Sequence, residues 1–391
     1  MTHRAEDTTI SQVMKCLIDQ GLDGMADAVG LLLNEAMKIE RSEFLQAGPY
    51  ERQVDRLGYA NGFKDKTVRT RVGEMRLKIP QVRDCVGEEG FYPSSLEKGL
   101  RSERALKLAI AEMYVNGVST RRVARITQEL CGLEVSSSDV SRASQLLDEE
   151  LETWRQRAIG EIPYLVLDAR YEKIRHGGSV IDCAVLVAIG VREDGKRSVL
   201  GVSVSLSEAE VHWRAFLTSL LDRGMHGMKL IVSDDHKGLG NGRISTMPSV
   251  PWQRCQFHLQ RNAQAYVPKV AMRSEVARAI RNIFNAPDRA EADRQLNILM
   301  DRYRDSAPQL AEWAEENLSQ GLSVFELPAG HRKRLRTTNG LERVNKEIKR
   351  RTRVATLFPN EASLLRLVSA ILAEISEDWE TERAYINVKA E

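Results

Sequence analysis

Apolar residues recur at helical spacing from residue 10 to residue 44, with a break near Gly21 to Gly24, so the chain is expected to begin with two helices. The period then shortens to two in the stretch TVRTRVGEMRLKIPQV, where apolar side chains alternate with cationic ones: Met75, Leu77 and Ile79 against Arg76 and Lys78. This alternation predicts a strand with one apolar and one cationic face, and a hairpin turn at Gly73-Glu74. A small basic β unit is therefore expected after the helical start.

Helical spacing returns between residues 102 and 157 and predicts three consecutive helices. The first ends at Gly117, the second is capped by Ser119 and ends at Gly132, and the third begins near Ser136 and continues through DVSRASQLLDEELETW. Three helices with short turns resemble a helix-turn-helix module, whose last helix enters the major groove of DNA. We assign DNA contacts to three arginines near the starts of the second and third helices: Arg121, Arg122 and Arg142. A three-helix unit that only packs is the alternative.

The centre of the chain has the pattern of an α/β domain. Apolar strands are predicted at residues 163–174, 179–191 and 196–205, an amphipathic helix follows at 208–224, and a further strand runs from 228 to 235. Hairpin-joined strands followed by a crossover helix and another strand form a mixed sheet. Asp234 lies at the end of the last strand, where open α/β sheets place ligands.

Asp168 interrupts the first apolar strand, where a carboxylate faces a desolvation cost unless a positive group meets it. Taken alone, either aspartate is explained more simply by a solvent-facing side chain or by an ion pair, for Asp168 with Arg170 or Arg175. Two aspartates on strands that can lie side by side repel each other strongly, and a hard cation such as Mg²⁺ is the ordinary remedy. The pair therefore predicts a site for divalent metal ions.

The stretch RTTNGLERVNKEIKRRTR, residues 336–353, places Glu342 among many arginines and lysines. Its apolar residues fall on one helical stripe, so an amphipathic helix is expected from about Asn339 to Arg353, packed against the sheet. A two-metal site for phosphoryl chemistry usually needs a third carboxylate, and Glu342 is the candidate. The same helix would hold a phosphate backbone with four cations: Lys346, Lys349, Arg350 and Arg353. The simpler alternative pairs Glu342 with Lys346 at i,i+4 spacing.

The composition narrows the class of protein. At 391 residues the chain exceeds a single typical domain, and its five cysteines are scattered without a CxxC pair, which suits a reducing cytoplasm. No apolar run reaches the roughly 18 residues of a membrane span, and the first residues have no apolar signal core, so we expect a cytoplasmic, nucleoid-associated protein without membrane contact. Basic charge is concentrated, with ten Lys or Arg against two Asp or Glu in residues 331–353, which suits binding to nucleic acid.

Six motifs follow one another along the chain: LVLDARY, HWRAFLTSLLDRG, VSDDHKGL, WQRCQFHLQRN, RTTNGLERVNKEIKRRTRV and FPNEASLLRLV. Together they resemble the Mutator-type transposases of bacterial insertion sequences, enzymes with a ribonuclease H-like DDE domain. The resemblance extends from the hairpin that begins near Gly58 to EDWE near the C-terminus. It places the three catalytic, metal-binding carboxylates of the family on Asp168, Asp234 and Glu342.

The resemblance also implies the architecture. The fold class is multi-domain α+β, with a ribonuclease H-like mixed α/β catalytic domain that carries a helical insertion. Helical and small β DNA-binding units precede it, including the helix-turn-helix. The implied units are a helical region at 1–50, a small basic β unit at 51–100, a helix-turn-helix unit at 101–157, the catalytic domain at 158–262 and 331–391, and the insertion at 263–330.

The reaction implied is that of a DNA transposase with two Mg²⁺ or Mn²⁺ ions in its site. A homodimer would bind double-stranded DNA, cleave it at the terminal inverted repeats of its element, and join the freed ends to target DNA. Two alternatives are a DNA-binding regulator with an impaired site and a metal-dependent nuclease that cuts without joining.

The Cys-x-x-His signature of the family falls on Cys255 and His258. Read alone, this pair could be half of a zinc site, but no second pair at ligand spacing follows. We expect Cys255 to be buried behind the site and His258 to lie near the scissile phosphate, as structural support or in direct contact. Trp313, within the insertion, is expected in the core rather than stacked on a base.

Two departures from the family pattern follow Asp234. Asp235 offers a carboxylate that competes with Asp234 for metal. The glycines and prolines of LGNGRISTMPSVP predict a shortened or irregular helix where the family has a regular one.

Overall fold

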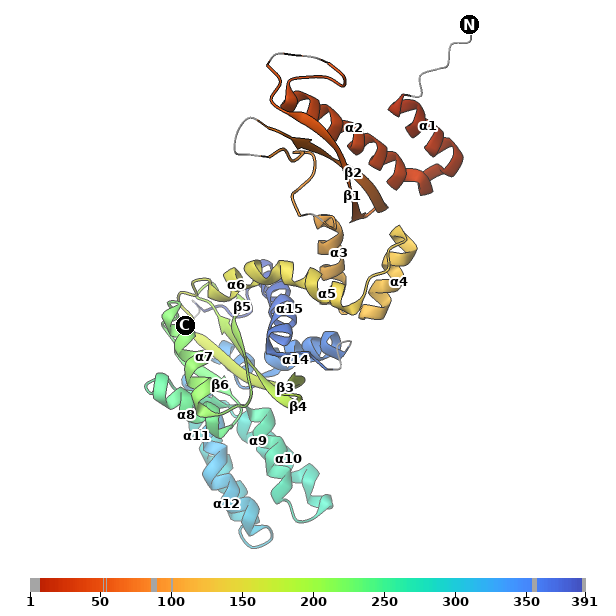
Figure 1. The fold of residues 1–391 in the computed structure, drawn as a ribbon. Coiled ribbons are helices and arrows are strands. Elements are labelled where there is room, and N and C mark those ends of the chain that lie inside the picture. Colours follow the sequence, from red (N-terminus) through yellow and green to blue (C-terminus); the bar gives the residue numbers. More distant parts are fainter. Residues whose placement is uncertain are drawn as a thin grey trace. The chain divides into compact units, whose positions relative to one another are not determined.

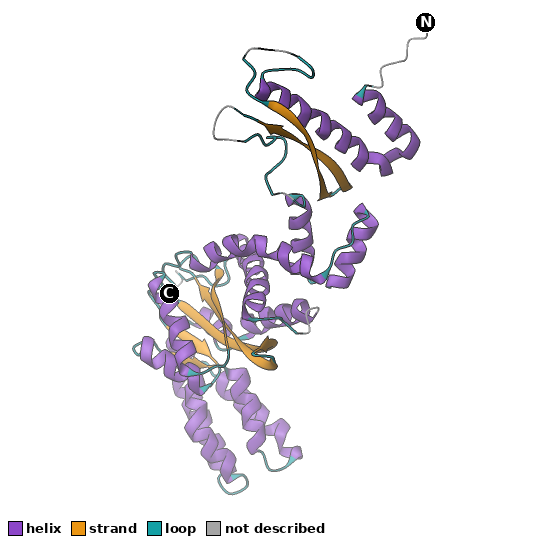
Figure 2. Ribbon diagram, in the orientation of Figure 1, coloured by secondary structure: helices purple, strands orange, loops and turns teal. Residues whose placement is uncertain are grey.

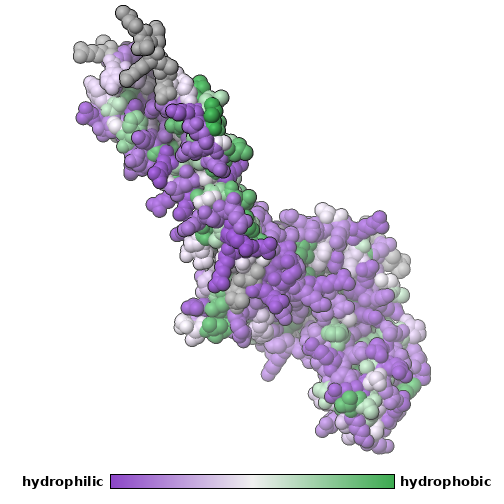
Figure 3. Space-filling view, turned by 90° about the vertical axis from the view of Figure 1, so that its right-hand side faces the viewer, coloured by the Kyte–Doolittle hydropathy of each residue, from purple (hydrophilic) through white to green (hydrophobic). Residues whose placement is uncertain are grey.

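The chain folds into two compact units, residues 1–146 and 147–391, drawn as ribbons in Figures 1 and 2. This computed structural model describes residues 8–51, 53, 55–85, 90–99, 101–353 and 357–388. None of the helices in these ranges is long and apolar enough to span a membrane. The face shown in Figure 3 is mostly hydrophilic. Helices and sheets occur together in both units, which confirms the predicted mixture of α and β structure.

Unit 1 begins with the two helices that the apolar spacing predicted, α1 (Thr9–Gln20) and α2 (Met25–Leu45), joined by the 3-10 turn η1 (Gly21–Gly24). An antiparallel hairpin follows, made of β1 (Tyr59–Thr70) and β2 (Gly73–Arg83). The alternation in β2 has the predicted result. Its apolar face, Met75, Leu77 and Ile79, is buried with Met37 of α2, while its cationic face stays exposed.

The hairpin turn lies at Arg71-Val72, two residues earlier than predicted. Thr70 pairs with Gly73 across the strands, and the Thr70 hydroxyl donates a hydrogen bond to the Gly73 carbonyl oxygen at 2.8 Å. Gly73 has a φ of 121°, which residues with a Cβ rarely adopt. The glycine is therefore needed at the start of β2, a role that the sequence does not distinguish from the turn itself.

Three helices complete unit 1: α3 (Arg104–Val115), α4 (Thr120–Cys131) and α5 (Ser137–Ser144). Ser119 caps α4 as predicted, and Ser136 caps α5 in a reciprocal capping box. The predicted third helix is longer than α5, because the 3-10 turn η2 (Gln145–Leu147) interrupts it at the boundary between the units. Its continuation, α6 (Asp148–Gln156), belongs to unit 2.

Unit 2 is built on a five-stranded sheet with the order β5-β4-β3-β6-β7. Its strands are β3 (Tyr164–His176), β4 (Ser179–Val191), β5 (Arg197–Ser205), β6 (Leu230–Ser233) and β7 (Trp252–Arg254). The first three are antiparallel neighbours, and β6 and β7 run parallel to β3. The sequence did not reveal β7, because three residues after a proline show no period.

In the described part of unit 2, further helices follow α6, and Figure 1 shows some of them beside the sheet and others extending beyond one end of it. They are α7 (Glu210–Asp222), α8 (Lys237–Thr246), α9 (Gln256–Ala263), α10 (Arg273–Phe284), α11 (Arg289–Tyr303), α12 (Pro308–Asn317), α13 (Ala329–Leu335), α14 (Asn339–Thr352) and α15 (Glu361–Thr381). Among the described residues, 3-10 turns between these helices include η3 (Gln264–Tyr266), η4 (Val270–Met272), η5 (Leu318–Gly321) and η6 (Ser323–Glu326).

The central strand β3 is buried on both faces, which explains its nearly continuous apolar sequence. Leu165 and Leu167 pack with Trp213 of α7 on one face. Tyr164 and Val166 belong to the core on the other face, which the helices α9 to α12 share. Successive side chains alternate between faces, so Asp168 follows Tyr164 and Val166 on the side of the sheet where α9 packs.

A shortened or irregular helix was predicted after Asp234, and the segment from Lys237 to Thr246 is an α-helix of 10 residues, α8, so the helix is not irregular there. Its glycines allow close packing instead. A Cβ on Gly242 would lie 2.9 Å from Trp213 Cβ, and a Cβ on Gly238 would lie 1.9 Å from the carbonyl oxygen of Glu208. The low helix propensity of glycine is offset by contact between α8 and α7.

The helical insertion leaves the sheet after β7 and returns at the start of α14, where the Gln256 amide donates to the Arg336 carbonyl oxygen at 3.0 Å. Trp313 of α12 is only 7% exposed and stacks on Tyr266, with ring centroids 5.4 Å apart. Trp313 is therefore a core residue, as expected.

Candidate active site

Asp168 and Asp234 lie level with each other on neighbouring strands. The parallel pairing of β3 with β6 joins Tyr164 to Leu230 and Val166 to Val232. The same offset of 66 residues joins Asp168 to Asp234 immediately beyond the paired segment. Neighbouring strands lie about 4.8 Å apart, so this register brings the two carboxylates together at the end of β6.

Asp168 is a buried carboxylate with two hydrogen-bond donors. The backbone amide of Ala169 donates to its Oδ1 at 2.9 Å, and the side-chain amide of Asn345 donates to its Oδ2 at 2.8 Å. Burial raises the pKa of Asp168 to about 6, and the negative charges of Asp234 and Glu208 add to the increase. The Ala169 hydrogen bond and the positive charge of His258 lower the same pKa but do not cancel the effect of burial.

His258, in the first turn of α9, lies between the other two acids. Its Nδ1 is 3.4 Å from Asp234 Oδ2, and its Nε2 is 3.8 Å from Glu342 Oε1. Interaction with the Cys255 thiol raises the pKa of His258, burial lowers it, and the charge of Asp234 raises it further, with a net increase. A protonated imidazole is thus favoured between two carboxylates.

Glu342 occupies the first turn of α14, where the helix dipole favours an anion. The structure shows Glu342 beside His258 and, among the described residues, no ion pair between Glu342 and Lys346. The simple surface pairing considered from the sequence is therefore not the arrangement found.

Cys255 lies fully buried directly before α9 and joins that helix to the start of α14. The backbone N–H and the hydroxyl of Thr338 both point to its Sγ, at 3.4 and 3.5 Å. Thr338 precedes α14 but gives it no side-chain cap, because its hydroxyl is directed at the sulfur. Burial acts to raise the pKa of Cys255, but interactions with His258 and Thr338 outweigh burial and lower it.

Asp235 points to a different partner from Asp234. Its Oδ2 lies 3.1 Å from a terminal nitrogen of Arg254, a side chain that is almost completely buried. The other terminal nitrogen of Arg254 donates to Asn317 at 2.8 Å and to Gln320 at 3.1 Å. Asp235 thus neutralises a buried cation that also holds the insertion, while Asp234 faces His258.

Two residues at the site were missed from the sequence. Asn345 lies three positions after Glu342 and therefore on the same side of α14, a spacing that could have suggested its role. Glu208 precedes α7, and its side chain is 12% exposed. No local pattern connects Glu208 with Asp168, because only the folded sheet brings the β5–α7 connection to β3.

The cations assigned to DNA binding differ in whether they already pair with an acidic side chain of the protein. On α14, Lys346, Lys349 and Arg353 are exposed, whereas Arg350 makes two hydrogen bonds to Glu347, at 2.8 and 2.6 Å. In unit 1, Arg121 and Arg122 are exposed at the start of α4, and Arg142 is exposed but hydrogen-bonded to Asp139 at 2.6 Å.

The carboxylate oxygens suit a hard divalent cation, although the acids do not lie close enough together to coordinate one in this structure. Within the described ranges, no three His, Cys, Asp or Glu side chains converge closely enough to hold an ion. Carboxylate oxygens are the ligands that Mg²⁺ and Mn²⁺ prefer, and the raised pKa of Asp168 shows that its buried charge lacks compensation. His258 Nδ1 and Asn345 Oδ1 are also buried without a hydrogen-bond partner, so both atoms are available to bind a ligand at the site. The chemistry of these side chains therefore fits a bound Mg²⁺ or Mn²⁺ ion.

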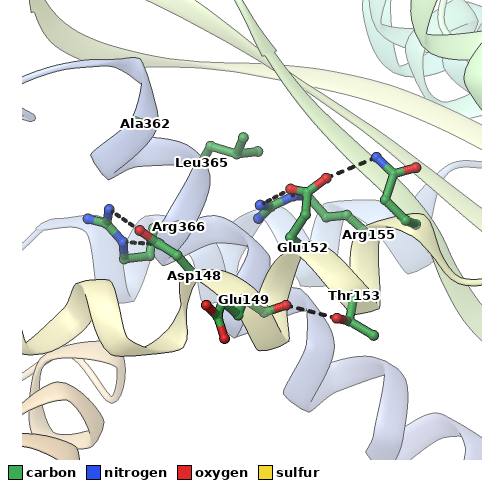
Figure 4. Close-up of a pocket in the computed structure, with 9 residues that line it drawn as sticks. Asp148, Glu149, Glu152, Thr153, Arg155, Ala362, Leu365 and Arg366 are labelled. Atoms are coloured by element: carbon green, nitrogen blue, oxygen red, sulfur yellow. Dashed lines mark hydrogen bonds and ion pairs between the residues drawn. The ribbon is translucent and has the colours of Figure 1, made fainter. Parts of the chain in front are cut away.

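A separate pocket of about 750 Å³ lies between α6 and α15 (Figure 4). Arg366 and Asp148 bridge it with hydrogen bonds of 2.5 and 2.9 Å, and Arg155 pairs with Glu152. None of the three acids lines this pocket, so the candidate active site is not there.

The fold and this site together define a mixed α/β protein with one carboxylate within its central strand β3 and a second directly after the neighbouring strand β6. The chain belongs to the Mutator family of transposases, because the family model "Transposase, Mutator family" matches residues 1–382. It is 55% identical over 389 residues to the transposase for insertion sequence element IS406 of Burkholderia multivorans, covering 99% of both chains. It is 40% identical to the ISRM5 transposase of Rhizobium meliloti, with 98% of this chain and 96% of that one covered. The IS256 transposase of Staphylococcus aureus is 36% identical, with 91% of each chain covered.

Proposed function

We propose that this transposase is a DDE enzyme whose catalytic acids are Asp168, Asp234 and Glu342. The observation that carries the proposal is the register of β3 and β6, which sets Asp168 level with Asp234. His258 then connects Asp234 to Glu342, which lies far away in the sequence. Three antiparallel strands followed by parallel ones, in the order β5-β4-β3-β6-β7, support a ribonuclease H-like assignment for this sheet.

The three carboxylates would hold two Mg²⁺ or Mn²⁺ ions, which supply activation of water or a DNA 3′-hydroxyl and stabilisation of the leaving 3′-oxygen. Asn345 fixes the orientation of the Asp168 carboxylate through its 2.8 Å hydrogen bond. His258 keeps positive charge between Asp234 and Glu342, so their repulsion is reduced before an ion or a phosphate arrives. Cys255 and Thr338 hold the first turns of α9 and α14 together, and with them His258 and Glu342.

The DNA substrate would contact both units. In unit 2, Lys346 and Lys349 are exposed on α14 about one and two turns after Glu342, so a backbone held by these two cations would lie beside the acids. In unit 1, α3 to α5 would act as a helix-turn-helix and recognise the terminal inverted repeats, with Arg121 and Arg122 exposed for that contact.

Joining two ends in register requires two active sites, so the proposed working form is a homodimer on DNA, in the cytoplasm and associated with the nucleoid. Light scattering coupled to size-exclusion chromatography tests this directly. A complex with the mass of two chains and two element ends is expected, and joining of both ends by a complex that contains a single chain would contradict it.

The reaction is tested with duplexes that carry an end of the element, with Mg²⁺ and a target DNA. Wild type should cleave at the end and produce joined product, and Glu342→Gln should do neither while still binding DNA. Cleavage without joined product would favour a nuclease, and binding without cleavage by wild type would favour a regulator. Glu347→Gln is the matched control, since Glu347 shares α14 but pairs with Arg350 and Arg351.

A further inference from the structure

Glu208 is a fourth acid near the candidate site, placed directly before Ala209, the residue that precedes α7. Its side chain is 12% exposed, and a carboxylate this deeply placed needs a partner. That partner is His236, whose Nδ1 lies 3.5 Å from Glu208 Oε2. His236 follows Asp234 by two residues and directly precedes α8. Glu208 therefore holds the short connection that carries Asp234.

The backbone of Glu208 touches the same region. Its carbonyl oxygen lies against Gly238 in the first turn of α8, where a Cβ would be only 1.9 Å away. No residue other than glycine fits this approach without moving one of the two segments. One turn later, Gly242 packs against Trp213 of α7 in a similar way. The side chain and the backbone of Glu208 thus fix the start of α8 from one side.

Glu208 also faces β3, the strand of Asp168. Burial and then the charge of Glu208 raise the pKa of Tyr171. The same charge adds to the raised pKa of Asp168, after the contributions of burial and Asp234. Glu208 also shares a hydrogen bond with the side chain of Tyr171, so it contacts β3 as well as the Asp234 connection. It stands between the two elements that carry the paired aspartates.

We propose that Glu208 is a positioning residue that holds the Asp234 connection level with Asp168 and so sets the separation of the two carboxylates. This inference rests on the proposed function, in which those carboxylates hold divalent ions. Asp234 follows the last residue of β6, so the ladder that aligns Val166 with Val232 no longer constrains it. The contacts of Glu208 with His236 and Gly238 supply that constraint. Groups that orient the ligands of a metal site set its affinity without touching the ion.

The test is a Mn²⁺ titration of the full-length protein at pH 8, with free Mn²⁺ followed by electron paramagnetic resonance. Glu208→Gln keeps the size of the side chain and removes its charge, and it should weaken Mn²⁺ binding about tenfold, the usual cost of losing such a partner. Glu208→Asp, which keeps the charge, should recover part of the affinity.

The matched control is Glu210→Gln. Glu210 Oε2 accepts a hydrogen bond from Asn241 at 3.1 Å, so it joins α7 to α8 without reaching the Asp234 connection. Its Mn²⁺ affinity should equal that of wild type. If Glu208→Gln does not fold, His236→Gln changes the other side of the same contact and should show the same loss.

Several outcomes overturn the inference. Wild-type affinity in a folded Glu208→Gln would do so, and so would an equal loss in Glu208→Gln and Glu210→Gln, which would show a general effect of α7–α8 packing. If Asp168→Asn loses Mn²⁺ binding but Glu208→Gln does not, the proposed metal site is supported and only the positioning role of Glu208 is refuted. If Asp168→Asn binds Mn²⁺ as wild type does, the proposed function fails and the inference fails with it.

Discussion

The side-chain amide of Asn345 donates a hydrogen bond to Asp168 Oδ2 at 2.8 Å, joining α14 to the centre of β3. Asn345 follows Glu342 by three residues, so one helix carries the third acid and also orients the first. The Asn345 carbonyl oxygen is in turn held by Arg170 of β3. The position of α14 on the sheet therefore decides the geometry of two of the three acids.

Asn345→Ala should lower both Mn²⁺ affinity and the rate of strand cleavage by about 10- to 100-fold, because Asp168 loses the donor that orients it. Calorimetric Mn²⁺ titration and single-turnover cleavage measure the two effects. Lys346→Ala, at the next position and exposed, is the control for metal binding and should leave Mn²⁺ affinity unchanged. Equal Mn²⁺ affinity in Asn345→Ala and wild type would contradict the role of the hydrogen bond.

Asp168→Asn should stabilise the metal-free protein at neutral pH. The folded pKa of Asp168, about 6, is above its ordinary value of 3.8, so the folded state binds the proton more tightly than the unfolded state. This contribution to stability is fully present below pH 4 and is lost as the pH rises through 6. At 1.36 kcal/mol per pKa unit, the difference of about two units corresponds to at most about 3 kcal/mol at pH 8.

Chemical denaturation of both proteins in the presence of a chelator measures this difference. The gain of Asp168→Asn over wild type should be largest at pH 8 and small near pH 4. A gain that does not change with pH would show that Asp168 is not a buried acid with a raised pKa.

His258→Gln should move the acid limb of Mn²⁺ binding to higher pH. The positive charge of His258 lowers the pKa of Asp168, so its removal lets that pKa rise, and protons then compete with metal at higher pH. Mn²⁺ affinity measured from pH 5 to 9 gives the midpoint for each protein. His176→Gln, an exposed histidine at the far end of β3, should leave the midpoint unchanged. A shift to lower pH in His258→Gln would refute this electrostatic role.

Lys349→Ala should weaken DNA binding and reduce its dependence on salt, by about one unit in the slope of log affinity against log salt. Lys349 is exposed and has no ion pair among the described residues. Arg350→Ala should have a smaller effect, because Glu347 already neutralises that guanidinium. Fluorescence anisotropy with an element-end duplex across a salt series measures both slopes. Unchanged slopes would show that the cations of α14 do not contact DNA phosphates and are ordinary solvent-exposed charges.

Much of the fold could be predicted from local periodicity. The strand β4 and the cap residues Ser119 and Ser136 have strong local signals, because burial and capping depend on neighbours in sequence. The regularity of the helix α8 could not be predicted. Gly238 and Gly242 weaken a helix by propensity, and only their contacts with Glu208 and Trp213 show why they are there.

The candidate site was predictable only in part for a similar reason. Asp168, Asp234 and Glu342 stand out as acids at strand ends or among cations, and the family resemblance assigns them roles. Glu208 and Asn345 do not differ in polarity or charge from the residues around them in a way that marks them as functional. Their importance comes from the packing of the β5–α7 connection and of α14 onto β3, and only the i,i+3 spacing of Asn345 from Glu342 gives a local signal of it.

If Asp168, Asp234 and Glu342 share bound metal, iron-directed cleavage of the polypeptide should cut the chain at all three places. Fe²⁺ takes the place of Mg²⁺, and ascorbate with peroxide then generates radicals that cut the chain beside the ion. Cuts near all three residues are expected, and they should be suppressed by excess Mg²⁺ and lost in Asp168→Asn. Cuts at other positions only, or an unchanged pattern in Asp168→Asn, would contradict it.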